Sequence, residues 1–555
     1  MSSVTPSSYR QVPQLDPGDP GGLTPDATVA IPSSASSDHA VARKAAFRIY
    51  WLTAVLCCGG ALFGYDSGVI GGVLTFDSFQ NDFNFTSDDK TRVSSIAVGI
   101  QQAGALIGCF AVWPLTNRGG RRLAMMVCSG IFCAGVVLET IRSGTLMTFY
   151  LGRTICGLGI GGSATIIPIY LGEMSPKEIR ARLGSCYQFT FTIGILISYW
   201  VDYAVAKLLP SSSSKQWQIP MALQLVPGAL MGLGMLTLHE SVRWLLFHNA
   251  NNHTQNKALE KQAWASLAWV RGGGTDEVHA EFNTIKTGVE SELQTRTDFH
   301  LSELITHKPN LHRLFLGFTI FLAQQSTGAT ALAYFGPQFF AMLVGPGDKN
   351  LLLTGVFGGV KVVACFVFVI FVAERLGRKP CLIYGALVMS VCMVITAFVV
   401  KAHPPPEPLS PSSTSSDEGG IPTAGLITVL LIYLNIIAFN LSWGPLPWPC
   451  ISEIFPTRIR EPGVAFGVAS QWLFNFLWSS TTPYIMAGIG WATFLLFGIL
   501  DLLFAGFVFG FLMETKGKSL EEITALFEGP SYLLLGEEDD GFKGSDREEQ
   551  VPLRS

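Results

Sequence analysis

Charged residues are scarce in this chain of 555 residues. Lys, Arg, Asp and Glu make up only 14% of it, against about 25% in soluble domains, whereas 49% of its residues are hydrophobic. The formal net charge of −4 argues against a nucleic-acid partner. The 11 cysteines form no CxxC pair, and no zinc spacing, Walker motif or nucleophile elbow occurs. We therefore expect no enzyme activity, no metal and no cofactor.

The hydrophobic residues fall into about a dozen blocks of roughly 20 residues each, the length that a helix needs to cross a bilayer. Within lipid each segment must satisfy its own backbone hydrogen bonds, which favours helices. The sequence predicts an all-α membrane protein with twelve transmembrane helices. The expected spans are 47–74, 93–115, 122–141, 147–172, 183–205, 220–239, 311–342, 351–373, 380–400, 423–452, 462–488 and 491–513.

Three short patterns occur twice, in the same order and at equivalent places. They are Glu173-x-x-Pro176-x-x-x-Arg180 with Glu453-x-x-Pro456-x-x-x-Arg460, Gly120-Arg121-Arg122 with Gly377-Arg378-Lys379, and Glu240-Ser241 with Glu514-Thr515. This repetition indicates two pseudo-symmetric halves of six helices, with a substrate site near the midplane between them. The expected parts are a disordered tail 1–46, a first half 47–244, a loop with short amphipathic helices 245–310, a second half 311–513 and a second tail 514–555.

Lys and Arg concentrate in every second loop, which sets the orientation. Both tails and the loop 245–310 are predicted to be cytoplasmic, in a multi-pass monomer of the plasma membrane. Asn84 begins an Asn-Phe-Thr sequon in an acidic loop on the outer side, so we expect glycosylation there.

Several segments resemble the sugar porter family of the major facilitator superfamily over about 47–525. The matching segments are GYDSGVIGG (64–72), NRGGRR (117–122), GRTICGLGIGGSATIIPIYLGEMSPKEIR (152–180), HESVRWL (239–245), QQSTG (324–328), ERLGRK (374–379), WGPLPWPCISEIFPTRIR (443–460) and METKGKSLEEI (513–523). The overall pattern is most similar to fungal members. The resemblance implies transport by alternating access.

Asp66 lies inside the first expected helix, and Arg153 near the start of the fourth. An ionisable residue at this depth is costly and is usually functional. Burial favours the neutral acid and a neighbouring arginine favours the carboxylate, so a conformational change can shift the balance. By resemblance, proton symporters of the family carry Asp at this position and facilitative carriers Asn. We predict a proton-coupling pair; the alternative is an ion pair that only holds two helices together.

Amide and indole side chains within apolar helices are candidates for substrate binding. Amides suit a ring of hydroxyl groups, and an indole offers a flat face to a sugar ring. The candidates, which by resemblance match family binding positions, are Gln188, Gln324, Gln325, Gln471, Trp448 and Trp472. The alternatives are interhelical hydrogen bonding for the glutamines and a lipid-interface anchor for Trp448.

Two candidates depart from the family pattern. Thr330 stands where the pattern QQxxGxN has asparagine, which weakens the expectation of glucose-like selectivity. Lys361 places a cation inside the eighth helix, where it could meet the carboxylate of quinate or a sugar acid. Alternatively, Lys361 pairs with an internal carboxylate or extends outward.

A set of charged residues at the cytoplasmic helix ends is predicted to form a gate that closes the inner side. Its members are Arg121, Arg122, Glu173, Arg180, Glu240, Arg243, Arg378, Glu453, Arg460 and Glu514. By resemblance, this network locks the outward-facing state through salt bridges across the halves. The alternative is a solvated positive-inside signature.

Together these features predict a secondary transporter that imports a monosaccharide or related polyol with protons. A quinate or sugar-acid permease, a facilitative uniporter and a non-transporting sensor are the alternatives.

Overall fold

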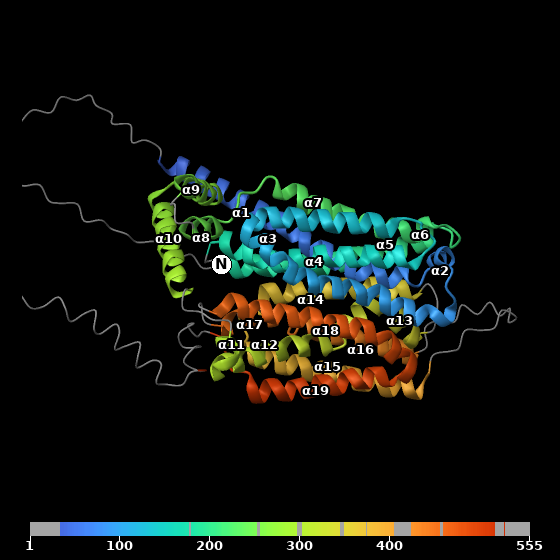
Figure 1. Cartoon of the computed structure of the whole chain (residues 1–555). Helices are drawn as coiled ribbons and strands as arrows, with labels where there is room; N and C mark the ends of the chain where they lie inside the picture. Colours follow the sequence, from blue (N-terminus) through green and yellow to red (C-terminus); the bar gives the residue numbers. More distant parts are fainter. Residues whose placement is uncertain are drawn as a thin grey trace, which may run out of the picture.

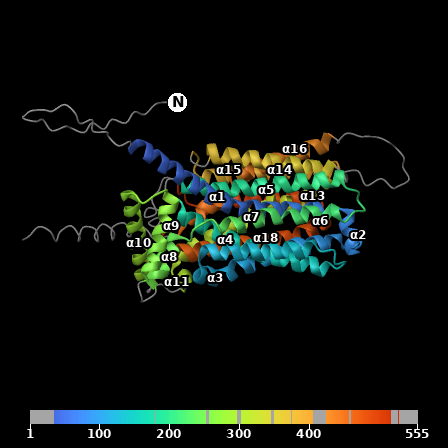
Figure 2. The same cartoon turned by 90° about the horizontal axis from the view of Figure 1, so that it is seen from above.

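The chain is helical throughout the part that its computed structural model describes. The described residues are 34–176, 179–251, 256–296, 302–344, 349–372, 375–404, 423–455, 459–516 and 527. Within these ranges there is no strand. Figures 1 and 2 show an elongated bundle in which most helices run along the same axis.

The first half of the bundle contains α1 to α7. Their bounds are α1 Ser34–Val73, α2 Asp77–Phe83, α3 Lys90–Thr140, α4 Leu146–Met174, α5 Arg180–Leu208, α6 Lys215–Leu223 and α7 Leu225–Met235. The 51 residues of α3 include a non-helical Gly120 with φ 83°, where two helices meet at a kink. A straight helix of that length would measure about 76 Å, more than twice the hydrocarbon thickness, so α3 supplies two crossings.

The second half contains α12 to α19. Their bounds are α12 Lys308–Ser326, α13 Ala329–Val344, α14 Lys349–Val367 with a π-helical extension Phe368–Val372, α15 Arg378–Ala402, α16 Thr423–Asn440, α17 Pro447–Ile454, α18 Arg460–Ile489 and α19 Ala492–Phe511. In Figure 1 these helices lie mainly below those of the first half. The arrangement is the predicted twelve-helix architecture, in which α6–α7, α12–α13 and α16–α17 are each one interrupted crossing. By length and composition alone, nine helices among the described residues qualify as membrane spans, with α3 taken as one.

Two differences from the expected spans have local causes. The expected helix 311–342 is interrupted at Gly328, whose φ of 79° ends α12 before α13 begins. The first helix begins at Ser34 rather than at 47, because Ala, Arg and Lys at 40–46 favour helix. The remainder of the expected tail, residues 1–33, lies outside the described residues, as do 517–526 and 528–555 of the second tail.

In the described residues that follow the first half there are four helices. They are α8 Val242–Asn251, α9 Lys257–Arg271, α10 Asp276–Arg296 and α11 Glu303–Thr306. Figure 1 shows α8, α9 and α10 together at one end of the bundle, with α2 at the other. We call the end that carries α8–α10 the basic end, because the Lys- and Arg-rich loops lie there, and the other the α2 end.

Hydrogen bonds join the two halves toward the α2 end. The Ser95 hydroxyl donates to the Ser480 carbonyl at 2.5 Å, and Tyr199 donates to the Ala333 carbonyl at 2.6 Å. Ser95 lies near the start of α3 and Tyr199 in the last third of α5, so both contacts are displaced toward the α2 end. The halves are therefore held together on that side.

Candidate functional site

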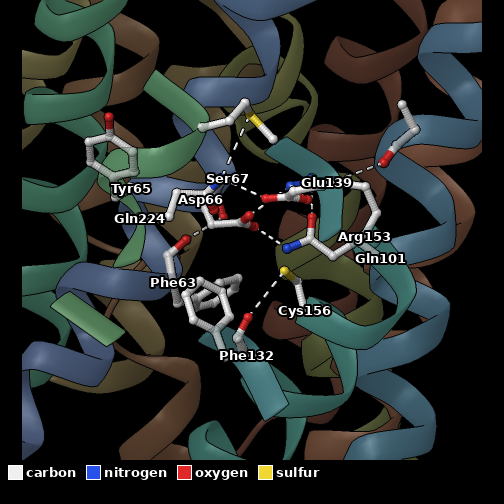
Figure 3. Close-up of polar contacts among 12 residues, drawn as sticks. Phe63, Tyr65, Asp66, Ser67, Gln101, Phe132, Glu139, Arg153, Cys156 and Gln224 are labelled. Atoms are coloured by element: carbon white, nitrogen blue, oxygen red, sulfur yellow. Dashed lines mark hydrogen bonds and ion pairs between the residues drawn. The ribbon is translucent and has the colours of Figure 1, made fainter. Parts of the chain in front are cut away.

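Asp66 and Arg153 form an ion pair at the centre of the first half. The Arg153 Nη1 atom lies 2.7 Å from Asp66 Oδ1, and neither side chain is exposed. Asp66 comes from α1 and Arg153 from the second turn of α4 (Figure 3). The structure thus brings together the two residues predicted to couple protons.

Gln101 of α3 completes the pair, and the sequence analysis missed it. Its amide nitrogen donates to Asp66 Oδ2 and its amide oxygen accepts from Arg153 Nη2, so it bridges both charges. Arg153 Nε also donates to the Ala97 carbonyl at 3.2 Å. Close packing of α4 on α3 makes these contacts possible: a Cβ atom at Gly157 would collide with the Gln101 carbonyl oxygen. An amide in an otherwise apolar helix was the available signal.

Glu139, in the last turn of the second crossing of α3, is a second missed residue. Its Oε2 atom lies 3.9 Å from Arg153 Nη1, and its Oε1 atom accepts from Gln224 Nε2 at 2.9 Å. The side chain is fully buried. The sequence signal was a carboxylate in the apolar run GVVLET, near the end of an expected helix.

The predicted amide cluster lies at the interruption of the seventh crossing. Gln324 Nε2 donates to the carbonyls of Trp443 and Gly444, both at 3.0 Å. It thereby supplies a hydrogen-bond donor to backbone carbonyls in the interruption between α16 and α17. The Thr330 hydroxyl donates to Gln325 Oε1 at 2.7 Å. The expected span 423–452 is thus interrupted between α16 and α17. In this arrangement the amides serve interhelical contacts.

The remaining substrate candidates lie on three other helices. Trp448 is half-buried in α17, with its ring 5.2 Å from that of Phe321. Gln471 and Trp472 are buried in α18. Within the part of the chain that the structure describes, the Gln471 amide oxygen and the Trp472 indole nitrogen have no hydrogen-bond partner. Gln188 is half-buried in α5. Unused polar atoms at Gln471 and Trp472 are available to a ligand.

Lys361 is a buried cation on α14 at the boundary between the halves. Its side chain is 3% exposed, and its ammonium nitrogen lies 5.5 Å from the centre of the Phe191 ring on α5. Phe191 also contacts Phe63, whose ring lies 5.2 Å from Trp472. Among the described residues no carboxylate lies within salt-bridge distance of Lys361. Neither an internal ion pair nor an outward-extended side chain accounts for it there.

The predicted gate residues form equivalent contacts in both halves at the basic end. The Glu240 carboxylate accepts from the backbone N–H groups of Arg121 and Arg122 at 2.8 and 3.0 Å. Glu514 does the same for Arg378 and Lys379, at 2.9 and 3.0 Å. Each of these contacts joins two residues of the same half and does not cross between the halves. The same is true of the ion pair between Arg121 and Glu173, at 2.9 Å.

Burial raises the pKa of Glu240 above its usual value, although three backbone donors oppose this shift. At Glu514 burial also acts to raise the pKa, but the backbone donors of Lys516, Arg378 and Lys379 outweigh it and the pKa is lowered. Arg243 is exposed at the start of α8. The side chains of Arg180, Glu453 and Arg460 lie outside the described residues.

The sequon residue Asn84 is exposed and follows α2 in the left-handed conformation, at φ 51°. Figure 1 shows α2, which Asn84 follows, at the end opposite α8–α10, where the predicted topology places a glycosylated loop.

Comparison with known proteins agrees with this architecture. Residues 52–527 match the family model described as sugar (and other) transporter. The chain is 36% identical to the quinate permease of Emericella nidulans, over 87% of this chain and 89% of that one, and 35% identical to a probable quinate permease of Aspergillus flavus, over 87% and 88%.

Among solved structures, the inward-open xylose transporter XylE from E. coli matches with a TM-score of 0.69 and 26% identity, over 86% of this chain and 99% of that one. The proton:xylose symporter XylE bound to 6-bromo-6-deoxy-D-glucose matches equally well, over 87% and 99%. These proteins are transporters, not enzymes, and the resemblance read from the motifs is confirmed. The chain therefore belongs to the sugar porter family of the major facilitator superfamily and is a multi-pass membrane transporter.

Proposed function

We propose that this transporter imports a polyhydroxylated carboxylate of the quinate type together with protons. The observation that carries the proposal is Lys361, a buried cation at the boundary between the halves. In the described part of the chain no carboxylate lies within salt-bridge distance of it. A buried charge is costly unless it is paired. An anionic substrate would supply the missing partner, and relatives at 34–36% identity are named quinate permeases.

The other candidate residues suit the hydroxyl groups and ring of such a substrate. Gln471 and Trp472 have unused polar atoms in α18. The rings of Phe63 and Phe191 lie between Trp472 and Lys361 and connect them by successive contacts. Gln325 and Thr330 bond to each other and can exchange that bond for a ligand hydroxyl. Gln188, Gln324 and Trp448 complete the proposed binding set.

Proton coupling is assigned to Asp66 and Arg153. With the site open to the outside, Asp66 takes up a proton, its hold on Arg153 weakens and substrate binds. The halves then rock, the site opens to the cytoplasm, and substrate and proton leave. The gate residues at the basic end hold the inner side shut in the outward-facing state.

The test is uptake of labelled quinate into proteoliposomes at acidic external pH, with glucose, xylose and galacturonate as competitors. We expect inhibition by galacturonate and not by the two neutral sugars. A monocarboxylate that enters with one proton carries no net charge, so a valinomycin-imposed membrane potential should leave the initial rate unchanged.

The second candidate is proton symport of a neutral monosaccharide, which the similarity to the xylose symporter favours. It predicts inhibition by xylose or glucose and acceleration by an inside-negative potential, because each cycle then moves one positive charge. Uptake that is insensitive to a protonophore would instead identify a uniporter. If none of these compounds were taken up, the protein would be identified as a sensor.

We place the protein in the plasma membrane as a monomer, with both termini and α8–α10 on the cytoplasmic side. Glycosylation of Asn84 tests this orientation. Glycosidase treatment should reduce the apparent mass of the wild type and not that of Asn84→Gln.

A further inference from the structure

Three ionisable side chains, rather than two, meet in the centre of the first half. Asp66 projects from α1, Glu139 from α3 and Arg153 from α4, and all three are fully buried (Figure 3). The uncharged partner of Glu139 is Gln224, which lies between α6 and α7. The cluster therefore holds two carboxyl groups and one guanidinium.

One guanidinium cannot neutralise two buried carboxylates, because one negative charge would remain unpaired. Asp66 has the shorter contact to Arg153, at 2.7 Å against 3.9 Å for Glu139, and Gln101 supports Asp66. Among the described residues the Glu139 Oε2 atom has no hydrogen-bond partner, which fits a neutral acid better than a carboxylate. In this arrangement the balanced state has Asp66 and Arg153 ionised and Glu139 protonated.

Protonation of Asp66 alone would leave the buried Arg153 charge without a counter-ion. The group placed to replace Asp66 is Glu139, whose free Oε2 atom already lies within ion-pair distance of the guanidinium. A small movement of either side chain converts this contact into a direct bond. The cluster can then remain neutral while Asp66 is protonated.

We propose that Glu139 is the second counter-ion of Arg153 and the donor of the proton that Asp66 receives. The proton leaves the Glu139 carboxyl group and binds the Asp66 carboxylate, while Arg153 changes its partner from Asp66 to Glu139. The cluster carries one proton and no net charge before and after the step. Release from Asp66 to the cytoplasm and uptake by Glu139 from outside complete the cycle, with one proton moved.

The position of Glu139 along the bundle fits this direction. It lies one residue before the end of α3, at the α2 end, whereas Arg153 is in the second turn of α4 and Asp66 is seven residues before the end of α1. Glu139 is thus nearer than the pair to the end assigned to the outside. The proton relay rests on the proposed coupling, but the exchange of counter-ions can be tested without any transport.

The first experiment is a double-mutant cycle on the melting temperature of the purified full-length protein in detergent. Asp66→Asn and Glu139→Gln should each be tolerated, because the other carboxylate still neutralises Arg153. The double variant should melt several degrees lower than the sum of the two single shifts, or fail to fold while both single variants fold. Purely additive shifts would overturn the proposal.

Two controls keep the cycle specific. Asp501 on α19, in the other half, is a buried carboxyl group whose two oxygens lack a hydrogen-bond partner among the residues described. Because it lies away from Arg153, Asp66→Asn combined with Asp501→Asn should be additive. The pair Asp66→Asn with Glu139→Asp retains a carboxylate near Arg153 and should recover part of the lost stability. Absence of any recovery would count against a charge effect.

The second experiment measures proton entry in proteoliposomes. Glu139→Gln should reduce substrate-driven proton uptake by tenfold or more and change its dependence on external pH. Proton uptake equal to that of the wild type at every pH would overturn the relay. If the wild type itself moves no protons, the proposed coupling fails, while the melting-temperature cycle still reports whether Glu139 replaces Asp66 beside Arg153.

Discussion

The ammonium group of Lys361 on α14 lies 5.5 Å from the centre of the Phe191 ring on α5, so a cation of one half faces an aromatic face of the other. A substrate carboxylate at this position would be paired with a desolvated charge. Loss of one partner of such a pair costs about 2–5 kcal/mol. Lys361→Gln should therefore reduce kcat/KM for quinate uptake by at least tenfold.

The matched control is Lys401→Gln. Lys401 also lies over an aromatic ring, 4.6 Å from the centre of Trp491, but it is exposed. This variant should transport quinate as the wild type does. Equal losses in both variants, or none in Lys361→Gln, would contradict the role given to Lys361.

Close packing of α3 on α4 should be sensitive to a single methyl group. A Cβ atom at Gly161 would collide with the Ala105 carbonyl oxygen, whereas one at Gly172 on the same helix would meet nothing within 4 Å. Gly161→Ala should destabilise the protein by about 1–3 kcal/mol through overpacking. Gly172→Ala should leave stability unchanged or raise it, because alanine favours helix. If the melting temperatures of both variants fell, the role given to close packing at Gly161 would be refuted.

The Glu514 carboxylate should stabilise the second half in a pH-dependent way. Its pKa is lowered in the folded protein, so its contribution is present above the usual Glu pKa of about 4.3 and is lost as pH falls through the lowered value. Glu514→Gln should therefore melt below the wild type at pH 7, with a difference that shrinks only as the pH falls below about 4.3. The exposed Glu277→Gln is the control, and a difference that stays constant with pH would rule out the charge effect.

Much of the fold could be predicted from the sequence because lipid imposes a simple rule on segment length. The expected helix 147–172 runs from Leu146 to Met174. Gly328 was not recognised as an interruption, because a glycine in an apolar run also occurs within continuous membrane helices.

The site was predicted in part, for a related reason. Asp66 and Arg153 stand out as charges within apolar runs, but their neighbours depend on how helices distant in sequence pack. Gln101 meets the pair only because Gly157 lets α4 approach α3. Glu139 lies at a helix end, where a charge usually faces water, and only the packing of α4 and α6 buries it.

The central claim is that Asp66 carries the proton that accompanies the substrate. Its most direct test is proton entry into proteoliposomes, followed with an internal pH-sensitive dye after quinate is added outside. The wild type should acidify the interior in proportion to uptake, and Asp66→Asn should exchange quinate without acidification. Undiminished acidification by Asp66→Asn would contradict the account.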